Sequence, residues 1–304
     1  MPDPEQTGSG PDTGGERLPE RAIASVEEAI TSQFYGGDGR ESRVLRLLGK
    51  VWAVIVAAGL GFGATLLSTA LVLGLLFSLD IFSIPRPSSP LFRLGVQFLF
   101  GQLLVMGGLS AAYLWATGNT IEYLDIHRPS LLQGAVVLVG PFVVFAINIA
   151  INLAGFAAGI QPAPNVLAEM VSGDPSLVLP LIPAMPLIVG PLEELLYRGV
   201  IQTRLTRSFT APVAILAASG IFAVIHIPAV WGQTTTLPSI LLSLVGLFGG
   251  AIAFGAIYEW TENLTVVALV HGLYNSMLLV LLYVRARYLD DLRRLAETTV
   301  VLAF

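Results

Sequence analysis

Long uncharged hydrophobic segments alternate with short polar linkers along most of this chain. Each segment holds at least the roughly eighteen apolar residues that a helix needs to cross the hydrocarbon core of a bilayer. The pattern therefore predicts an all-α protein, a polytopic bundle of transmembrane helices. The seven predicted spans are Val51 to Ser78, Leu94 to Thr117, Leu131 to Ile160, Leu177 to Leu205, Ala211 to Trp231, Pro238 to Trp260 and Leu264 to Tyr283.

The two ends of the chain depart from this pattern. The first residues are rich in Pro, Gly, Asp and Glu, and their small apolar surface cannot offset the entropy of ordering, which predicts a disordered acidic tail. Apolar residues recur at helical spacing from Ile23 to Phe34, which predicts a short amphipathic surface helix. An eighth, interfacial or re-entrant piece is the alternative for Tyr288 to Phe304. The predicted divisions are 1–21 for the tail, 22–46 for the surface helix and a linker, 47–284 for the membrane domain with its motif core at 177–283, and 285–304 for an amphipathic C-terminal tail.

Composition narrows the class of protein. Hydrophobic residues make up 54% of the chain and charged residues 12%, which excludes an ordinary soluble globular protein. The net charge of −5 lies wholly in the first forty-five residues, and the remainder is balanced, so no basic surface is expected to bind nucleic acid. Cysteine is absent, which excludes disulfides, thiolate zinc sites and a cysteine nucleophile.

Basic residues in the linkers predict the orientation of the bundle. Under the positive-inside rule they favour a cytoplasmic N-terminus. These residues are Arg40, Arg43, Arg46, Lys50, Arg128, Arg204 and Arg207. The four arginines after the last span, Arg285, Arg287, Arg293 and Arg294, would then lie outside, a conflict that the eighth piece would resolve. The protein is expected to be an integral protein of the plasma membrane.

Five ionisable side chains remain inside the spans once the linkers and span ends are set aside. They are Glu193, Glu194, Arg198, His226 and His271. An ionisable group in hydrocarbon costs about 2.5 to 3.5 kcal/mol on insertion scales, so such groups turn toward the protein interior and usually mark a site. Glu194 and His226 each lie sixteen residues from Thr210, so an antiparallel helix pair that turns there places them at one depth, ~24 Å away. We therefore expect a polar site within the membrane.

Spacing within the helices separates the two glutamates. Glu194 and Arg198 are four residues apart with the acid first, the favourable order for a helical ion pair, which predicts a structural pair. Glu193 projects about 100° away from Glu194 and can face a cavity without an arginine partner. Phe222 and His226 share one helix face, and Phe222 is expected to serve in packing.

Two further pairs repeat the same four-residue spacing. His271 and Asn275 present two hydrogen-bonding groups on one face of the last span. Asn148 and Asn152 do so in the third span, where hydrogen bonding between helices is the favoured interpretation and substrate contact the alternative.

Three motifs together carry a family resemblance. Glu193-Glu194-Leu-Leu-Tyr-Arg198, Phe222-Ala-Val-Ile-His226 and His271-Gly-Leu-Tyr-Asn275 resemble the successive EExxxR, FxxxH and HxxxN motifs of the CAAX protease and bacteriocin-processing family (CPBP, or Abi). The resemblance covers roughly Leu177 to Tyr283. It implies an intramembrane endopeptidase that acts on a membrane-associated protein, as the Ras-converting endopeptidase does on prenylated CAAX proteins.

The resemblance also implies roles for single residues. Glu193 resembles the general base that activates water, and His226 resembles the partner that helps to hold that water. His271 and Asn275 resemble the donors that stabilise the oxyanion. The supporting residues are Glu194, Arg198 and Phe222, and the expected mechanism needs no cofactor.

Two other functions stay open from the sequence. Glu193, His226 and His271 could bind zinc in the pattern of two histidines and one carboxylate, which would make the protein a metalloprotease. No HExxH motif is present and the histidines lie on different helices, so the metal-free glutamate mechanism is favoured. The second alternative is a non-catalytic membrane scaffold or immunity protein, which would not need Glu193 as a base.

Overall fold

The computed structural model describes residues 41–84, 89–163, 174–232 and 235–289. The predicted acidic tail, the predicted surface helix up to residue 40 and the C-terminal tail from residue 290 lie outside these ranges. The chain divides into two compact units, Met1–Leu48 and Gly49–Phe304. Within the first unit, the described residues form the start of helix α2, which begins at Glu41.

The described residues are helical and contain no β-strand. The α-helices are α2 (Glu41–Ile81), α3 (Pro90–Gln97), α4 (Gly108–Ala116), α5 (Leu131–Ala157), α7 (Leu181–Ala184), α8 (Gly190–Glu194), α9 (Thr203–Thr206), α10 (Ala211–Ile225), α11 (Ile227–Val230), α12 (Leu237–Thr261) and α13 (Leu264–Val284). The 3₁₀ turns are η2 (Ile121–Leu124) and η3 (Pro175–Val178). Wider π-helical stretches are η1 (Phe98–Gly107), η4 (Met185–Val189), η5 (Leu195–Gln202) and η6 (Arg285–Leu289). The π-helical stretches continue neighbouring α-helices, so η3, α7, η4, α8, η5 and α9 together make one long helical segment.

Six of the seven predicted spans are helices long and apolar enough to cross a membrane. They are Arg43–Ile81, Leu94–Ala116, Leu131–Ala157, Pro175–Thr206, Leu237–Thr261 and Leu264–Tyr288. Many of their large apolar side chains are exposed, as in α5, where Leu131 is 98% and Phe156 69% exposed. Such a surface is stable in lipid and would be unfavourable in water. The prediction of an all-α transmembrane bundle is therefore confirmed.

The remaining predicted span, Ala211 to Trp231, is not one continuous helix. It forms the shorter apolar helix α10, a break at His226 and the short helix α11. Pro228 explains the break, because it has no N–H to donate to the preceding turn and disfavours helical geometry in the residue before it. His226 therefore lies at a helix end, where its carbonyl accepts a hydrogen bond from Ala229 N at 2.9 Å.

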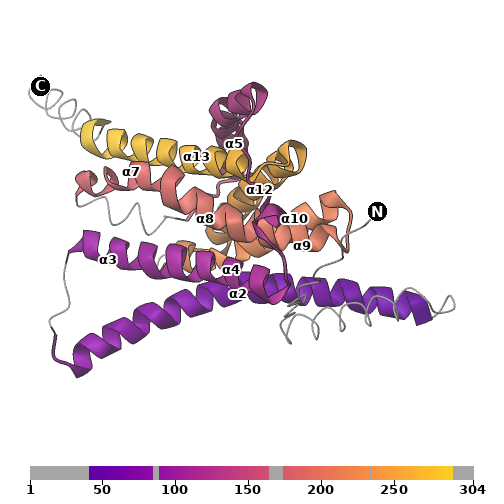
Figure 1. Cartoon of the computed structure of the whole chain (residues 1–304). Helices are drawn as coiled ribbons and strands as arrows, with labels where there is room; N and C mark the ends of the chain where they lie inside the picture. Colours follow the sequence, from indigo (N-terminus) through magenta and orange to yellow (C-terminus); the bar gives the residue numbers. More distant parts are fainter. Residues whose placement is uncertain (1–40, 85–88, 164–173, 233–234, 290–304) are drawn as a thin grey trace, which may run out of the picture. The chain divides into compact units, whose positions relative to one another are not determined.

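Glycines allow α13 to approach η4 and α8 closely (Figure 1). A Cβ added at Gly190 would lie 2.5 Å from Ala268 O, and one added at Gly272 would lie 2.3 Å from Pro186 Cα. Real side chains do not tolerate such distances, so only glycine permits this backbone contact. The contact brings the glutamates of α8 beside the histidine of α13.

Polar contacts connect several linkers at one end of the second unit. The backbone of Asp125 accepts a hydrogen bond from Leu264 N at 3.0 Å, and its carboxylate accepts one from Tyr258 Oη at 3.0 Å. Gln133 Nε2 donates to Thr261 O at 2.9 Å, beside the capping box of Ser130 and Gln133 that starts α5. The start of α5, the end of α12 and the start of α13 therefore lie together.

Candidate active site

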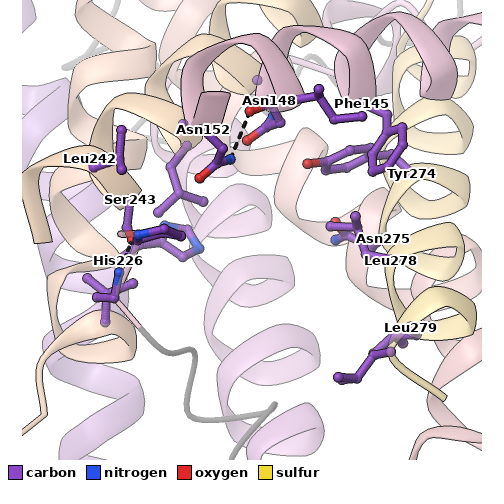
Figure 2. A pocket seen from close by; sticks show the side chains of 18 of the residues that line it. Phe145, Asn148, Asn152, His226, Leu242, Ser243, Tyr274, Asn275, Leu278 and Leu279 are labelled. Atoms are coloured by element: carbon purple, nitrogen blue, oxygen red, sulfur yellow. Dashed lines mark hydrogen bonds between the residues drawn. The ribbon is translucent and has the colours of Figure 1, made fainter. Parts of the chain in front are cut away.

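A cavity of about 1040 Å³ opens among α5, α8, α10, α12 and α13. All four residues predicted to be catalytic line it: Glu193, His226, His271 and Asn275. Much of the remaining wall is apolar, with side chains such as Phe145, Leu242 and Leu278 (Figure 2). The structure thus brings residues from three motifs to one recess.

Glu194 is the central member of a buried polar cluster. Its side chain is fully buried, and its Oε2 lies 3.1 Å from Arg198 Nε. Arg198 Nη1 also donates to Glu194 Oε1 at 3.2 Å, while Nη2 donates to the carbonyl of Ala251 on α12 at 2.8 Å. The guanidinium lies 5.5 Å from the Phe222 ring centroid. The arginine therefore has partners on its own helix and on two neighbours, as a buried charge requires.

Glu193, one residue earlier, has no arginine partner among the described residues. It is 7% exposed and lines the cavity. Gln102 Nε2 donates to its Oε1 at 3.1 Å, and its Oε2 lies 3.8 Å from His271 Nε2. One carboxylate oxygen is thus held by an amide, and the other lies near an imidazole nitrogen.

The sequence analysis did not predict Gln102 as a residue of the site. It lies in η1, in the half of the chain without a motif, and the search for ionisable side chains passed over a neutral amide. A glutamine inside a predicted span was the only available signal, and it gave no hint of its partner.

His271 is held on both its edge and its face. Its Nδ1 lies 2.6 Å from Glu194 Oε1, and its ring stacks on Phe254 with centroids 4.4 Å apart and planes 22° apart. Because a carboxylate oxygen accepts, Nδ1 carries the proton of this hydrogen bond. In the neutral ring Nε2 is then an acceptor, and it donates only when the imidazole carries both protons.

His226 is oriented by a backbone carbonyl. Its Nδ1 lies 2.7 Å from Phe222 O, so Nδ1 is again the donor and Nε2 is left for another partner. The His226 ring lies 4.5 Å from the Phe222 ring, which also contacts Tyr197 edge-on at 5.0 Å. Phe222 therefore packs as predicted, between the histidine and the arginine cluster.

The four predicted catalytic residues are not all in direct contact. Among their side chains the structure gives one close pair, Glu193 and His271. His226 and Asn275 line the same cavity, are half-buried, and lie on opposite sides of the view in Figure 2. The side chain of Asn275 makes no hydrogen bond to the residues that the structure describes, so its amide is free to bind another group at the cavity wall.

The asparagines of α5 also line this cavity. Asn148 Nδ2 donates to Val144 O at 3.3 Å, and Asn152 Nδ2 donates to Asn148 O at 2.8 Å. Both bonds stay within α5. The favoured interpretation of hydrogen bonding between helices is therefore wrong for the described residues.

The fit of the zinc alternative depends on the distances among the three proposed ligands. Within the described ranges no group of three His, Cys, Asp or Glu side chains is close enough together to hold a metal ion. The Nδ1 atoms of both histidines already have protein partners, which leaves one Nε2 on each ring.

A buried acid–histidine cluster in a cavity among membrane-spanning helices is the kind of site that an intramembrane hydrolase requires. Residues 175–277 match a family model described as Rce1-like, type II CAAX prenyl endopeptidase Rce1-like. The matched segment, about a third of the chain, contains all three motifs, so this part of the chain resembles the CAAX protease family, as the motifs implied. No curated protein and no solved structure matches the chain. The match and the six membrane-capable helices together indicate a membrane protease, with a membrane-associated protein as its class of substrate.

Proposed function

We propose that this chain is an intramembrane glutamic endopeptidase that cleaves a membrane-associated protein of the prenylated CAAX type. The observation that carries the proposal is the environment of Glu193. Its carboxylate lines a cavity among membrane-spanning helices, has no arginine partner among the described residues, and lies beside the Nε2 of His271. A carboxylate in this position can accept a proton from a water molecule, directly or through its neighbour.

The proposed reaction uses Glu193 twice. Its carboxylate takes a proton from water while the water oxygen bonds to the carbonyl carbon of the scissile peptide. The carbonyl oxygen becomes an oxyanion. Glu193 then gives the proton to the leaving nitrogen as the carbon–nitrogen bond breaks, and the products are a carboxyl group and an amine. The carboxylate ends the cycle in its starting form.

The other three residues support this step in different ways. His226 Nε2, the acceptor of its neutral ring, can receive a hydrogen bond from the attacking water. The Asn275 amide can donate to the oxyanion in any state of the site, whereas His271 Nε2 can donate only when its ring carries both protons. Fixed donors at an oxyanion are typically worth about 3 to 4 kcal/mol of barrier each.

The metal-free route is part of the proposal. It rests on Glu193, whose carboxylate lines the cavity beside His271 and can act as a base without a metal. Dialysis of the purified protein against a strong chelator should leave activity unchanged, and elemental analysis should find less than one zinc per chain. Loss of activity that returns when zinc alone is added would replace the glutamic mechanism with a metalloprotease.

The experiment that tests the proposed function compares peptide termini. Cells that carry the wild type and cells that carry Glu193→Gln are analysed for the new termini of membrane and secreted proteins. Termini present only with the wild type would identify substrates and cleavage sites. Glu193→Gln is nearly isosteric, so the variant should accumulate in the membrane normally.

The same comparison separates the protease from a scaffold. A scaffold or immunity protein should keep its cellular phenotype with Glu193→Gln, because folding and binding surfaces are retained. If both strains show the same termini and the same phenotype, the proposed proteolysis is rejected.

A further inference from the structure

We infer that Asn148 and Asn152 form a subsite that binds the backbone of an extended substrate peptide. The inference deepens the proposed function, because it says how this cavity holds a polypeptide before cleavage. It starts from two polar side chains on α5 for which the proposed mechanism has no use, and which the family match to 175–277 does not include.

The two amides have unused hydrogen-bonding capacity. Each donates one N–H to a carbonyl of its own helix, as described above. An asparagine amide has two N–H groups and one acceptor oxygen, so each retains a donor and an acceptor. No hydrogen bond to either Oδ1 is present within the described ranges, and both residues are half-buried at the cavity wall.

Glycines of α12 lie next to Asn148, where a larger residue would press on its amide. A Cβ added at Gly246 would lie 3.0 Å from Asn148 Oδ1, and one added at Gly250 would lie 3.5 Å from its Nδ2. Gly246 and Gly250 also line the cavity. Figure 2 shows the two asparagines next to each other, above His226 and Asn275 in the view.

The spacing of the amides suits a peptide strand. Residues four apart on a helix are ~6 Å apart along its axis. In an extended chain, alternate residues present their N–H and C=O groups on the same side every ~6.7 Å. The two amides can therefore bind two alternate peptide units of one strand, each with one donated and one accepted hydrogen bond.

The membrane environment makes these backbone hydrogen bonds important for peptide binding. A peptide drawn into a water-poor cavity must satisfy its backbone polar groups, and each group left unpaired costs several kcal/mol. Apolar walls such as those of Phe145 and Leu242 cannot supply these bonds. An amide pair supplies them for any side-chain sequence, so the subsite contributes affinity without selecting particular residues.

The test measures peptide binding to a variant of the protein that is expected not to cleave the peptide. Full-length Glu193→Gln protein in nanodiscs is titrated with a fluorescent farnesylated peptide that ends in a CAAX sequence. The same titration uses a peptide N-methylated at alternate residues, which lacks the N–H groups. Asn152→Leu, similar in size and without polar atoms, is compared with Val143→Leu, an exposed position of α5 that does not line the cavity.

The asparagine substitution is expected to reduce the effect of N-methylation on peptide binding. N-methylation should weaken binding by about tenfold in the parent and the Val143→Leu control, and by about threefold in Asn152→Leu, in which Asn148 still binds one peptide unit. With Glu193 intact, Asn152→Leu should raise KM by about fivefold to tenfold and leave kcat nearly unchanged. Asn148→Ala and Asn152→Ala serve as second variants if a leucine prevents folding.

The other possible outcomes reject the subsite, the proposed proteolysis or both. If N-methylation weakens binding equally with and without the asparagines while the peptide is cleaved, the subsite is rejected and the protease stands. If binding depends on the asparagines but no peptide is cleaved, the subsite stands and the proposed activity is rejected. If the farnesylated peptide is neither bound nor cleaved, both are rejected.

Discussion

The adjacent glutamates differ in what their carboxylates contact, and this difference predicts different effects of one substitution. Glu194→Gln removes the negative charge that Arg198 and His271 share at 3.1 and 2.6 Å. Removal of one partner from a buried pair costs about 3 to 5 kcal/mol, so this variant should be markedly destabilised. Glu193→Gln should lose all turnover with little change in stability, because its carboxylate contacts only an amide and a histidine edge.

Thermal unfolding in detergent and a peptide-cleavage assay together measure both effects. The expected pattern is a large fall in Tm for Glu194→Gln and an unchanged Tm with no activity for Glu193→Gln. Equal loss of activity with unchanged Tm in both variants would contradict this division of roles.

The hydrogen bond from Gln102 to Glu193 leads to a second prediction about a single residue. Its amide fixes Oε1 of Glu193, so Gln102→Met, which keeps the length of the side chain and removes the donor, should let the carboxylate rotate. A misplaced base typically costs ten- to a hundredfold, so kcat should fall by about that factor while KM stays nearly constant. Gln97→Met, the same change at an exposed glutamine of the same span, is the control. A rise in KM without a fall in kcat would show that Gln102 contacts substrate instead of positioning Glu193.

The sequence could predict much of the site, because ionisable residues are rare in hydrocarbon and each one stands out. Glu193, His226, His271 and Asn275 were expected in one cavity, and all line it. The partner of His271 could not be predicted. Its Nδ1 bonds to Glu194 through a contact between residues 77 positions apart, and no spacing along a helix encodes such a contact. The catalytic roles of the four residues stay predictions.

At the scale of elements, the contact of α13 with η4 and α8 depends on two glycines. Gly272→Ala would bring a methyl group against the backbone of Pro186, where the distance to Cα is 2.3 Å. Backbone cannot yield as a side chain does, so the helices should separate and the bond between His271 and Glu194 should lengthen. Overpacking costs about 1 to 3 kcal/mol or more, and activity should fall with stability.

Gly134→Ala is a matched control on α5. A Cβ there meets no atom within 4 Å, so this substitution should be neutral or slightly stabilising, since alanine favours helix more than glycine does. Both variants are compared by Tm and by cleavage rate. Wild-type stability and activity in Gly272→Ala would show that the close approach of η4 and α13 is not needed.

The sequence predicted where helices exist more reliably than where they break. Hydrophobic length alone located six spans, because a bilayer requires about twenty apolar residues in a row. The break at His226 was missed, although Pro228 carried the signal, since hydropathy treats proline as one more uncharged residue. The π-helical stretches, such as η5 between Glu194 and Thr203, depend on packing between helices and leave no pattern in the sequence.

At the scale of the whole molecule, basic residues gather at one end of the second unit. The guanidinium of Arg207 lies 4.8 Å from the Tyr123 ring, and Lys50 Nζ lies 5.7 Å from the Phe209 ring. The linkers around Tyr123 and Phe209 therefore share an end with the start of α13, which contacts Asp125. Arg285 and Arg287 follow the other end of α13, about 30 Å further along the helix.

This arrangement sharpens the prediction of orientation. Two groups of basic residues lie at opposite ends, and the positive-inside rule counts those near short loops. Among the described residues of the second unit, Lys50, Arg128, Arg204 and Arg207 at one end outnumber Arg93, Arg285 and Arg287 at the other, so the end that carries Arg207 is expected in the cytoplasm. The acidic tail at 1–21 is expected on the same side.

Single cysteines test this orientation directly, because the natural chain has none to interfere. Ser9→Cys reports the tail, exposed Thr210→Cys reports the end that carries Arg207, and exposed Ser83→Cys reports the far end of α2. Intact cells are treated with an impermeant maleimide, before and after permeabilisation. Only Ser83→Cys should react in intact cells, whereas Ser9→Cys and Thr210→Cys should react after permeabilisation alone. Labelling of Thr210→Cys from outside would place the Arg207 end beyond the cytoplasm and reverse the orientation expected from its positive charge.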